Sequence, residues 1–311
     1  MTPPRPGLLA HVGDTPLVEL PRLSPKPGVR LFAKLEGHNP SGSVKDRIAL
    51  AMVEQAEAQG RLAPGGTLVE ASTGNTAIAL AMVARQKGYR LKVVIPEGVV
   101  PSIADILCLY GVEVLWCAPR AGMRGAIDEA LRLADAHGWV ATRQFDNPVN
   151  PRVHHDTTGA ELLRELPDID VFVAGIGTGG TLMGVGCRLM EHNPGVALVG
   201  VEPRMGEHLQ GLRSLDDGYC PPLVDLDILS ARYLIPADRA LRATRRLVEV
   251  EGVLAGVSGG ATLHAALRYA ERIERGNVVF MVSDGGWKYL PAKPWDAAEA
   301  EDSGLDETHW W

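Results

Sequence analysis

The sequence predicts an α/β protein with two three-layer domains, each built on a mostly parallel sheet. Short apolar runs typical of strands alternate along most of the chain with longer runs of helical periodicity. Such alternation is typical of parallel strands whose connecting helices cover both faces of the sheet. Similar numbers of these units lie before and after residue 150, and 311 residues are enough for two ordinary domains.

The elements are expected in a regular order. Apolar runs predict strands at 31–35, 67–70, 91–95, 112–116, 139–142, 171–175, 198–202 and 278–283. Helical periodicity predicts helices at 45–59, 75–87, 101–109, 124–136, 158–166, 180–191, 239–250 and 259–274. Residues 1–28, rich in Pro and Gly, predict an extended arm packed on a partner surface. The tail from Pro291 is acidic, but its two final tryptophans favour docking over free solvation.

Composition excludes several functional classes. A net charge of −7 argues against nucleic acid as the main partner, because phosphate backbones bind basic surfaces. The apolar runs are too short to cross a bilayer and the N-terminus lacks an apolar signal core, so we expect a cytoplasmic protein without membrane contact. Four cysteines without CxxC spacing predict reduced core thiols, and no metal site is expected. We interpret His154 and His155 as ordinary loop residues.

The loop 38–47 joins a predicted strand to a predicted helix and presents Lys45 at the first turn of that helix. Asn39, Pro40 and Gly42 give the loop its turn chemistry. The positive end of a helix dipole disfavours a protonated ammonium, which favours the neutral amine that Schiff-base chemistry requires. Taken alone, a solvated surface lysine is the simpler interpretation.

A second strand-to-helix loop, Ser72–Thr76, offers hydroxyls, a side-chain amide and several backbone N–H groups at a helix start. Such a set of donors suits a carboxylate. The alternative is an ordinary helix cap, but a cap needs only one of these residues.

A third loop, Gly175–Thr181, is so rich in glycine that an anion can approach several backbone N–H groups, and a phosphate is the expected guest. The loop lacks the GK[ST] of a triphosphate loop. It does match GxGxxG, and Glu202 ends the next strand where an acid would bind ribose, so an NAD-dependent oxidoreductase is the second hypothesis. A fourth loop places Ser258 at a helix start, as either a helix cap or a hydrogen-bonding residue of the site.

Together these loops resemble the cysteine synthase family of pyridoxal-phosphate enzymes, which has the tryptophan-synthase-β-like fold (type II). The matching motifs are Gly13–Leu17, Asn39–Arg47, Ser72–Thr76, Gln144–Pro148, Gly177–Thr181, Ser258–Gly260 and Asp284–Leu290. There are departures: the first two residues of the family's Thr-Ser-Gly-Asn-Thr-Gly loop are exchanged, and Ala77 replaces its last glycine.

The resemblance implies a role for each matched residue. Lys45 is similar to the catalytic lysine that forms the Schiff base with pyridoxal 5′-phosphate, and Asn75 and Ser258 to residues that bind its ring. The cofactor's phosphate is expected on Gly177, Thr178, Gly179, Gly180 and Thr181. The substrate's carboxylate is expected on Ser72, Thr73, Gly74, Thr76 and Gln144. It further implies a large cofactor-binding domain (1–40 and 152–290), a small mobile substrate-binding domain (41–151) and a tail (291–311).

Several segments resemble more closely the B-type, actinobacterial-like enzymes that prefer O-phospho-L-serine. Arg213 is similar to the arginine with which those enzymes select the phosphate. The resemblance implies synthesis of L-cysteine by a homodimer, with sulfide or a small sulfur-carrier protein ending in a thiocarboxylate as sulfur donor. A B-type enzyme using O-acetylserine with sulfide or thiosulfate is the alternative, and a non-catalytic relative would need a broken site.

Overall fold

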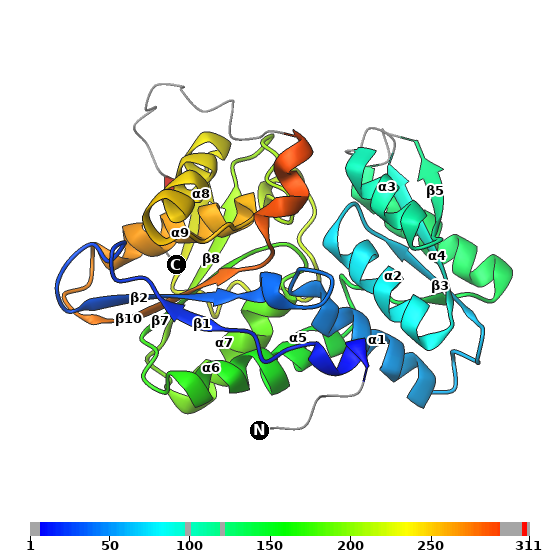
Figure 1. Cartoon of the computed structure of the whole chain (residues 1–311), viewed down its shortest axis with the longest axis horizontal. Coiled ribbons are helices and arrows are strands. Elements are labelled where there is room, and N and C mark those ends of the chain that lie inside the picture. The colour runs from blue at the N-terminus through cyan, green and yellow to red at the C-terminus, as the bar shows by residue number, and fades with distance from the viewer. Residues whose placement is uncertain (1–6, 97–100, 119–121, 293–306, 310–311) are drawn as a thin grey trace. The chain divides into compact units, whose positions relative to one another are not determined.

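The structure, a computed structural model, describes residues 7–96, 101–118, 122–292 and 307–309. The chain divides into two compact units, each with its own sheet (Figure 1). The first unit comprises Met1–Gly13 and Asn39–Asn150, and the second comprises Asp14–His38 and Pro151–Trp311.

The N-terminal segment is divided differently from the prediction, which placed residues 1–40 in the large domain. Leu9 and Val12 pack against the apolar core of the first unit, so this part of the segment belongs there. Further along, Leu20 and Leu23 are buried in the core of the second unit. The predicted arm therefore packs on its own chain.

The first unit has three layers around a parallel sheet of strand order β5-β4-β3-β6. Its strands are β3 (Thr67–Ala71), β4 (Arg90–Pro96), β5 (Glu113–Cys117) and β6 (Val140–Ala141). Its helices are α1 (Lys45–Ala58), α2 (Asn75–Lys87), α3 (Pro101–Leu109) and α4 (Gly122–His137). Leu68 of β3 shares a core with α1 and α2, whereas Val69 packs with alanines of α4. Successive side chains of this buried strand thus serve opposite layers.

The second unit is built on a seven-stranded sheet of order β1-β2-β10-β7-β8-β9-β11, parallel except at β1 and β11. Its strands are β1 (Leu17–Glu19), β2 (Val29–Leu35), β7 (Val171–Gly175), β8 (Ala197–Pro203), β9 (Ala231–Ile235), β10 (Gly276–Val282) and β11 (Glu307–His309). Its main helices are α6 (Ala160–Glu165), α7 (Gly180–His192), α8 (Ala237–Glu251) and α9 (Val257–Ala270). α8 and α9 cover one face of the sheet and α6 and α7 the other (Figure 1).

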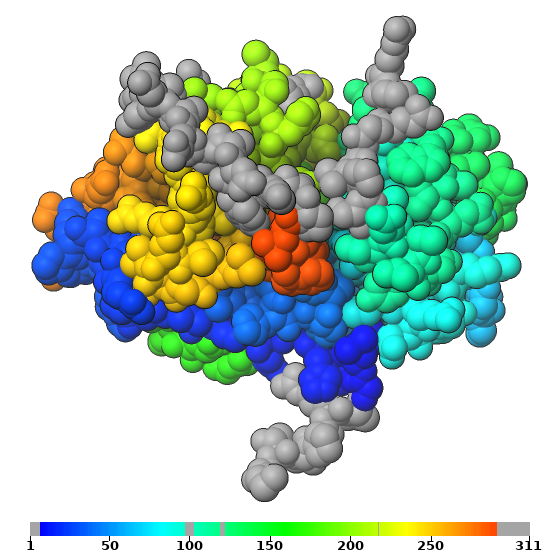
Figure 2. Space-filling model, turned by 45° about the horizontal axis from the view of Figure 1, so that its top comes forward, coloured from blue at the N-terminus to red at the C-terminus, as the bar shows by residue number. Residues whose placement is uncertain are grey.

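Shorter helices complete the chain. They are η1 (Leu8–His11), η2 (Glu36–His38), α5 (Val149–Val153), the π-helix η4 (His154–Gly159), η5 (Leu215–Asp217) and η6 (Gly286–Ala292). η6 forms part of the outer surface of the second unit in Figure 2, where Trp287 is half-exposed. The backbone N–H of Gly286 donates to Leu254, which follows α8.

The fold confirms the predicted α/β class with mostly parallel sheets, and the structure adds three strands to the prediction. β1 and β9 lie where no strand was expected, and Glu307–His309 of the acidic tail pairs with β9 as the edge strand β11. Trp310 and Trp311, which suggested docking of the tail, lie outside the described residues.

The cysteines were predicted to be core thiols, and this prediction is wrong for most of them. All four are unpaired by disulfides; Cys108, Cys187 and Cys220 are exposed, and Cys117 is partly buried. Each stands on a helix or loop surface, or on the partly exposed strand β5, because the cores are filled by branched aliphatic residues and alanine.

Gly260 marks the closest contact between α8 and α9. A Cβ at this position would lie 2.1 Å from Thr244 Oγ1 and 2.2 Å from the carbonyl oxygen of Ala240. We expect Gly260→Ala to destabilise the protein by roughly 1–3 kcal/mol or more, because the helices must separate. Urea unfolding measures the change. Gly259→Ala is the matched control, since its Cβ would come no nearer than 3.0 Å to another atom; equal losses would contradict this packing argument.

Candidate active site

Lys45 is the first residue of α1, where the loop pattern predicts it, and Asp46 fixes the loop before it. The buried carboxylate of Asp46 accepts the backbone N–H of Ser41 (N–Oδ2 2.6 Å) and the Ser41 hydroxyl. Gly42 has a positive φ of 86° and donates its N–H to Asn39. Lys45 is half-buried at the positive end of the helix. The hydrogen bonds of Asp46 make the loop that presents it rigid.

The loop Ser72–Thr76 follows the carboxyl end of β3 and opens α2. Ser72 Oγ accepts the backbone N–H groups of Gly74 (3.3 Å) and Ala77 (3.2 Å). Its oxygen therefore stabilises the helix start, while its hydroxyl proton is left to donate to a ligand. Thr73, Gly74 and Asn75 are only half-buried, so they form the accessible part of the loop. The structure confirms that Ser72 stabilises the helix start, and its role towards a ligand stays a prediction.

Gln144 and Thr76 are joined by hydrogen bonds that assign their roles. Gln144 Nε2 donates to the carbonyl oxygen of Ala71 (3.0 Å), so Oε1 faces Thr76 and accepts its hydroxyl proton (2.6 Å). Gln144 keeps one N–H for a ligand. We expected Thr76 to bind a carboxylate itself, but its proton is committed to Gln144. Thr76 therefore orients the amide in this structure.

Behind Gln144 lies Glu70, a buried acid of β3 that sequence reasoning missed. Its carboxylate accepts the Thr142 hydroxyl and the backbone N–H groups of Gln144 (3.2 Å) and Ala71 (3.0 Å). Burial raises the pKa of Glu70 to about 7, although these hydrogen bonds oppose the rise. A Glu within an otherwise apolar strand is the one sequence signal that could have identified it.

The raised pKa of Glu70 predicts a pH-dependent contribution to stability. Between about pH 4.5 and 7 the folded protein keeps a proton that the unfolded chain has lost, so the free energy of unfolding falls as the pH rises. The loss reaches at most about 3 kcal/mol. Urea unfolding of the wild type and of Glu70→Gln at pH 5 and pH 8 measures this loss of unfolding free energy, because Gln does not titrate. If the unfolding free energies of the two proteins changed equally between these pH values, the raised pKa of Glu70 would be contradicted.

In the second unit, the loop Gly177–Thr181 leads into α7 with a bare backbone. Gly179 has a positive φ of 87°, and a Cβ on Gly177 would lie 2.6 Å from the carbonyl oxygen of Gly211. Side chains are thus excluded from both positions. The N–H of Gly180 lies 3.4 Å from Thr178 Oγ1, and the next N–H groups at the start of this 13-residue helix have no intrahelical acceptor. This arrangement suits a phosphate group.

His154 supports this loop from the π-helix η4, so the expectation of an ordinary loop residue is wrong. It is fully buried; its Nε2 lies 3.2 Å from Thr181 Oγ1 and its Nδ1 2.9 Å from Thr158 Oγ1. His155 instead lies at the surface beside Asp156 and Glu191. The interruption of a helix by π geometry is frequent at functional sites.

Ser258 and Arg213 lie close to the phosphate loop within the second unit. Ser258 is buried in the first turn of α9, and a Cβ on Gly211 would come within 3.9 Å of its Oγ. The backbone N–H of Arg213 donates to Ile176 (2.8 Å), and its guanidinium lies 5.6 Å from the ring centre of Tyr219. The segment containing Gly211 and Arg213 therefore runs beside both Ser258 and the glycine loop.

Glu202, the acid that favoured an NAD site, is engaged elsewhere. Its buried carboxylate forms an ion pair with Arg232 (2.9 Å) and accepts the backbone N–H of Leu215 (2.6 Å). A ribose hydroxyl would have to displace both partners. The structure thus argues against the dinucleotide hypothesis.

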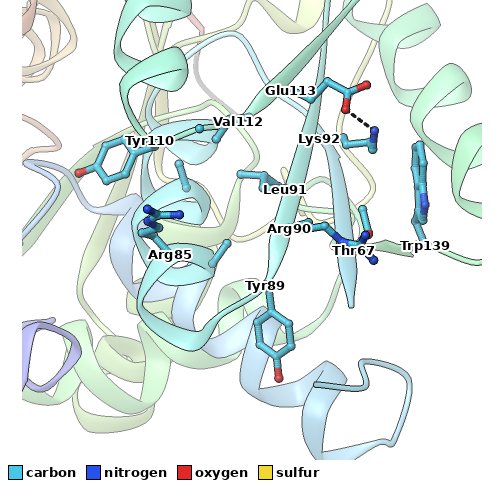
Figure 3. A pocket seen from close by; sticks show the side chains of 13 residues that line it. Thr67, Arg85, Tyr89, Arg90, Leu91, Lys92, Tyr110, Val112, Glu113 and Trp139 are labelled. Carbon is cyan, nitrogen blue, oxygen red and sulfur yellow. Dashed lines mark hydrogen bonds and ion pairs between the residues drawn. The ribbon is translucent and has the colours of Figure 1, made fainter. Parts of the chain in front are cut away.

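A pocket of about 460 Å³ lies at the other end of the first unit's sheet, where β3, β4 and β5 begin (Figure 3). Lys92 in its wall pairs with Glu113 and lies 4.7 Å from a ring centre of Trp139. None of its lining residues belongs to the predicted site. Ligands of open parallel sheets bind beyond the carboxyl ends of the strands, so we assign this pocket no part in the reaction.

Two features are absent from the part of the chain that the structure describes. No helix there is both long enough and apolar enough to cross a membrane. No group of three or more His, Cys, Asp or Glu side chains is placed there to hold a metal ion.

Comparison with known proteins decides between the remaining interpretations. A family model described as "Pyridoxal-phosphate dependent enzyme" matches residues 8–284. Cysteine synthase from Staphylococcus aureus is 40% identical over 289 residues, which cover 90% of this chain and 93% of that protein. The chain belongs to the cysteine synthase family of pyridoxal-phosphate-dependent enzymes.

Other cysteine synthase relatives are similar along the same length. Cysteine synthase B from Salmonella typhimurium is 39% identical over 280 residues, covering 90% of this chain and 92% of that protein. The crystal structure of O-ureido-L-serine synthase superposes with a TM-score of 0.91 at 36% identity, covering 97% of this chain and 98% of that chain. The chain therefore has the type II fold of pyridoxal-phosphate enzymes.

The cofactor of this family is pyridoxal phosphate, and the residues of the chain fit it. The glycine loop 177–181 offers N–H donors to a phosphate without side chains in the way. A lysine at the start of α1 would supply an amine to the cofactor's aldehyde. The neutral hydroxyl of Ser258 is suited to a pyridine nitrogen that stays unprotonated.

Proposed function

We propose that this chain makes L-cysteine by replacing the leaving group on Cβ of an activated serine with sulfur, and that O-phospho-L-serine is the preferred substrate. The observation that carries the proposal is the placement of Lys45 at the rigid start of α1 in a chain of this family. No other described feature of the first unit presents a lysine in this way.

The cofactor is proposed to lie on residues of both sequence halves. Gly177, Thr178, Gly179, Gly180 and Thr181 hold its phosphate, the Ser258 hydroxyl donates a hydrogen bond to the pyridine nitrogen, and Asn75 hydrogen-bonds the cofactor's 3′ oxygen. When bound, pyridoxal phosphate draws electron density from Cα of the amino acid. Because Ser258 is neutral, elimination and replacement are favoured over transamination.

The chain's own groups carry the binding and proton transfer. Ser72, Thr73 and Gln144 donate hydrogen bonds to the substrate's carboxylate at the start of α2, and Gly74, whose N–H already donates to Ser72 Oγ, leaves room for it there. Thr76 fixes the amide of Gln144 for this task. The amine of Lys45 removes the proton from Cα and returns it after sulfur has bound to Cβ.

The preference for O-phospho-L-serine is assigned to Arg213. Its backbone is fixed against Ile176, directly before the glycine loop, and its planar guanidinium can pair bidentately with a phosphate dianion. Loss of the leaving phosphate from Cβ is then favoured by charge pairing. A neutral acetate ester gains no such pairing, so O-acetylserine is the weaker substrate and remains the alternative.

A visible spectrum of the purified protein tests the proposal. We expect a yellow chromophore whose absorbance changes much faster with O-phospho-L-serine than with O-acetylserine. Faster change with O-acetylserine would keep the cysteine synthase and overturn the substrate preference. Absence of a chromophore after addition of pyridoxal phosphate would overturn the whole assignment.

The partners are proposed on the same basis. The sulfur donor is sulfide or a small carrier protein with a C-terminal thiocarboxylate, and two copies of the chain form a homodimer. The unit containing Lys45 is the small, mobile substrate-binding part. Product formation with each donor and light scattering of the holoenzyme test the first two statements.

A further inference from the structure

The turn that follows β6 binds the carboxylate of Glu70 as if it were an anionic ligand. Thr142 donates its hydroxyl, and the backbone N–H groups of Arg143 and Gln144 both contribute hydrogen bonds to Glu70. Consecutive N–H groups pointing at one anion form the backbone arrangement called a nest. Thr142 continues the pairing with β3, because its N–H donates to the carbonyl oxygen of Val69 (3.3 Å), and the Glu70 carboxylate supports the turn from there onward.

The turn needs that support because Arg143 has a positive φ of 61°, a conformation that a long side chain rarely adopts. Its guanidinium does not help to hold Glu70, since it pairs with Asp146 and is more than half exposed. Within the described part of the chain, the groups facing Glu70 are the Thr142 hydroxyl and the N–H groups of Ala71, Arg143 and Gln144, and none of them is charged.

Among the residues that the structure describes, three anchors hold Gln144. Glu70 accepts its N–H (3.2 Å), Asn150 Nδ2 donates to its carbonyl oxygen (2.7 Å), and its side-chain amide is fixed between Ala71 and Thr76. Glu70 is the only one of these anchors that carries a charge, and it alone also holds the two residues before Gln144.

We propose that Glu70 is a positioning residue for substrate binding: its ionised carboxylate holds the turn 142–144 so that the amide of Gln144 faces the substrate's carboxylate. The inference rests on the proposed function, in which Gln144 belongs to the carboxylate site. Glu70 itself is buried and hydrogen-bonds Gln144, so in this proposal it acts on the substrate only through that residue. Its loss therefore weakens recognition of the carboxylate specifically.

The test compares two ligands that differ only in that group. L-Serine and L-serinamide are titrated into the holoenzyme, and the absorbance of the bound cofactor reports binding of each. Glu70→Gln is expected to raise the Kd of L-serine roughly five- to tenfold, the effect of losing one good hydrogen bond, and to leave that of L-serinamide nearly unchanged. Equal changes for both ligands, or none, would overturn the proposal.

A double-mutant cycle tests whether Glu70 acts through Gln144. In a Gln144→Ala background, Glu70→Gln is expected to have no further effect on the Kd of L-serine, because the amide it positions is absent. Additive effects would contradict this route. Glu161→Gln is the matched control: it removes a buried carboxylate that pairs with Lys34 in the other unit, and should leave serine binding unchanged.

The pH profile separates positioning from a general loss of structure. All groups facing Glu70 are donors that serve the ionised form, so serine affinity of the wild type should fall as the pH decreases below 7. In Glu70→Gln this part of the profile is expected to disappear. L-Serine is used because the phosphate of O-phosphoserine itself titrates near pH 6.

A second variant keeps the test decisive where Glu70→Gln does not fold. Thr142→Val removes one donor and keeps the carboxylate, and it should raise the Kd of L-serine by a smaller factor, again without affecting L-serinamide. Turnover of O-phosphoserine by the wild type is recorded in parallel. If there is none, the proposed substrate is overturned, but the proposal for Glu70 is not. A wild-type chromophore insensitive to L-serine would overturn both proposals.

Discussion

Lys45→Ala is expected to remove the covalent chromophore and to lower kcat by at least about 10²–10⁴-fold, the share that general acid–base catalysis alone provides. The variant loses both the amine that binds the cofactor's aldehyde and the base that removes the Cα proton. Absorbance of the purified protein and the rate of cysteine formation measure the two losses. The variant should stay folded, since the half-buried Lys45 side chain adds little to the core.

Lys92→Ala is the control for this experiment, because it removes a lysine of the same unit that pairs with Glu113 at the opposite end of the sheet. Its spectrum and rate should match the wild type. Borohydride reduction followed by peptide mapping gives an independent result: the label should lie on the peptide that contains Lys45. A label on any other lysine would refute the assignment.

Arg213→Ala is expected to lower kcat/KM for O-phospho-L-serine by roughly 10- to 100-fold, equivalent to about 1–3 kcal/mol of transition-state binding. The leaving phosphate dianion loses its bidentate partner, whereas the neutral acetyl group of O-acetylserine never had one. Steady-state kinetics with both substrates measure the ratio. Its reversal towards O-acetylserine is the expected result.

Arg213→Lys sharpens this prediction, because it keeps the charge and removes the planar fork. An intermediate kcat/KM would assign part of the effect to geometry and part to charge. Unchanged kinetics with O-phosphoserine in Arg213→Ala would refute the role of this residue. Loss of activity with both substrates to the same degree would point instead to a structural role beside Ile176.

The sequence predicted the strands and helices whose pattern is local, and it failed where burial depends on distant partners. β9 was missed because its five residues carry Arg232 at the second position, which argues against a buried strand. Arg232 is nevertheless buried, since Glu202 on the neighbouring strand pairs with it. That partner is brought close only by the folded sheet.

In the candidate site, too, local patterns were predictable and contacts between distant residues were not. The turn chemistry before Lys45 is local, so its place at the start of α1 could be predicted from the loop alone. The hydrogen bond from Thr76 to Gln144 joins residues 68 positions apart, and the bond from Gln144 to Glu70 spans 74. No spacing rule in the sequence connects such pairs. The commitment of the Thr76 proton and the support from Glu70 could therefore be found only in the structure.

The exposed cysteines matter for a protein proposed to make cysteine, because surface thiols can exchange with disulfides. Although Cys187 and Cys220 are exposed, partial desolvation of their sulfur atoms and nearby carboxylates raise the pKa values of both thiols above the ordinary value. Disulfide exchange requires the thiolate, so at neutral pH both thiols react slowly with disulfides. Cys187 and Cys220 are thus slow to form mixed disulfides with the oxidised form of the cysteine that such an enzyme releases.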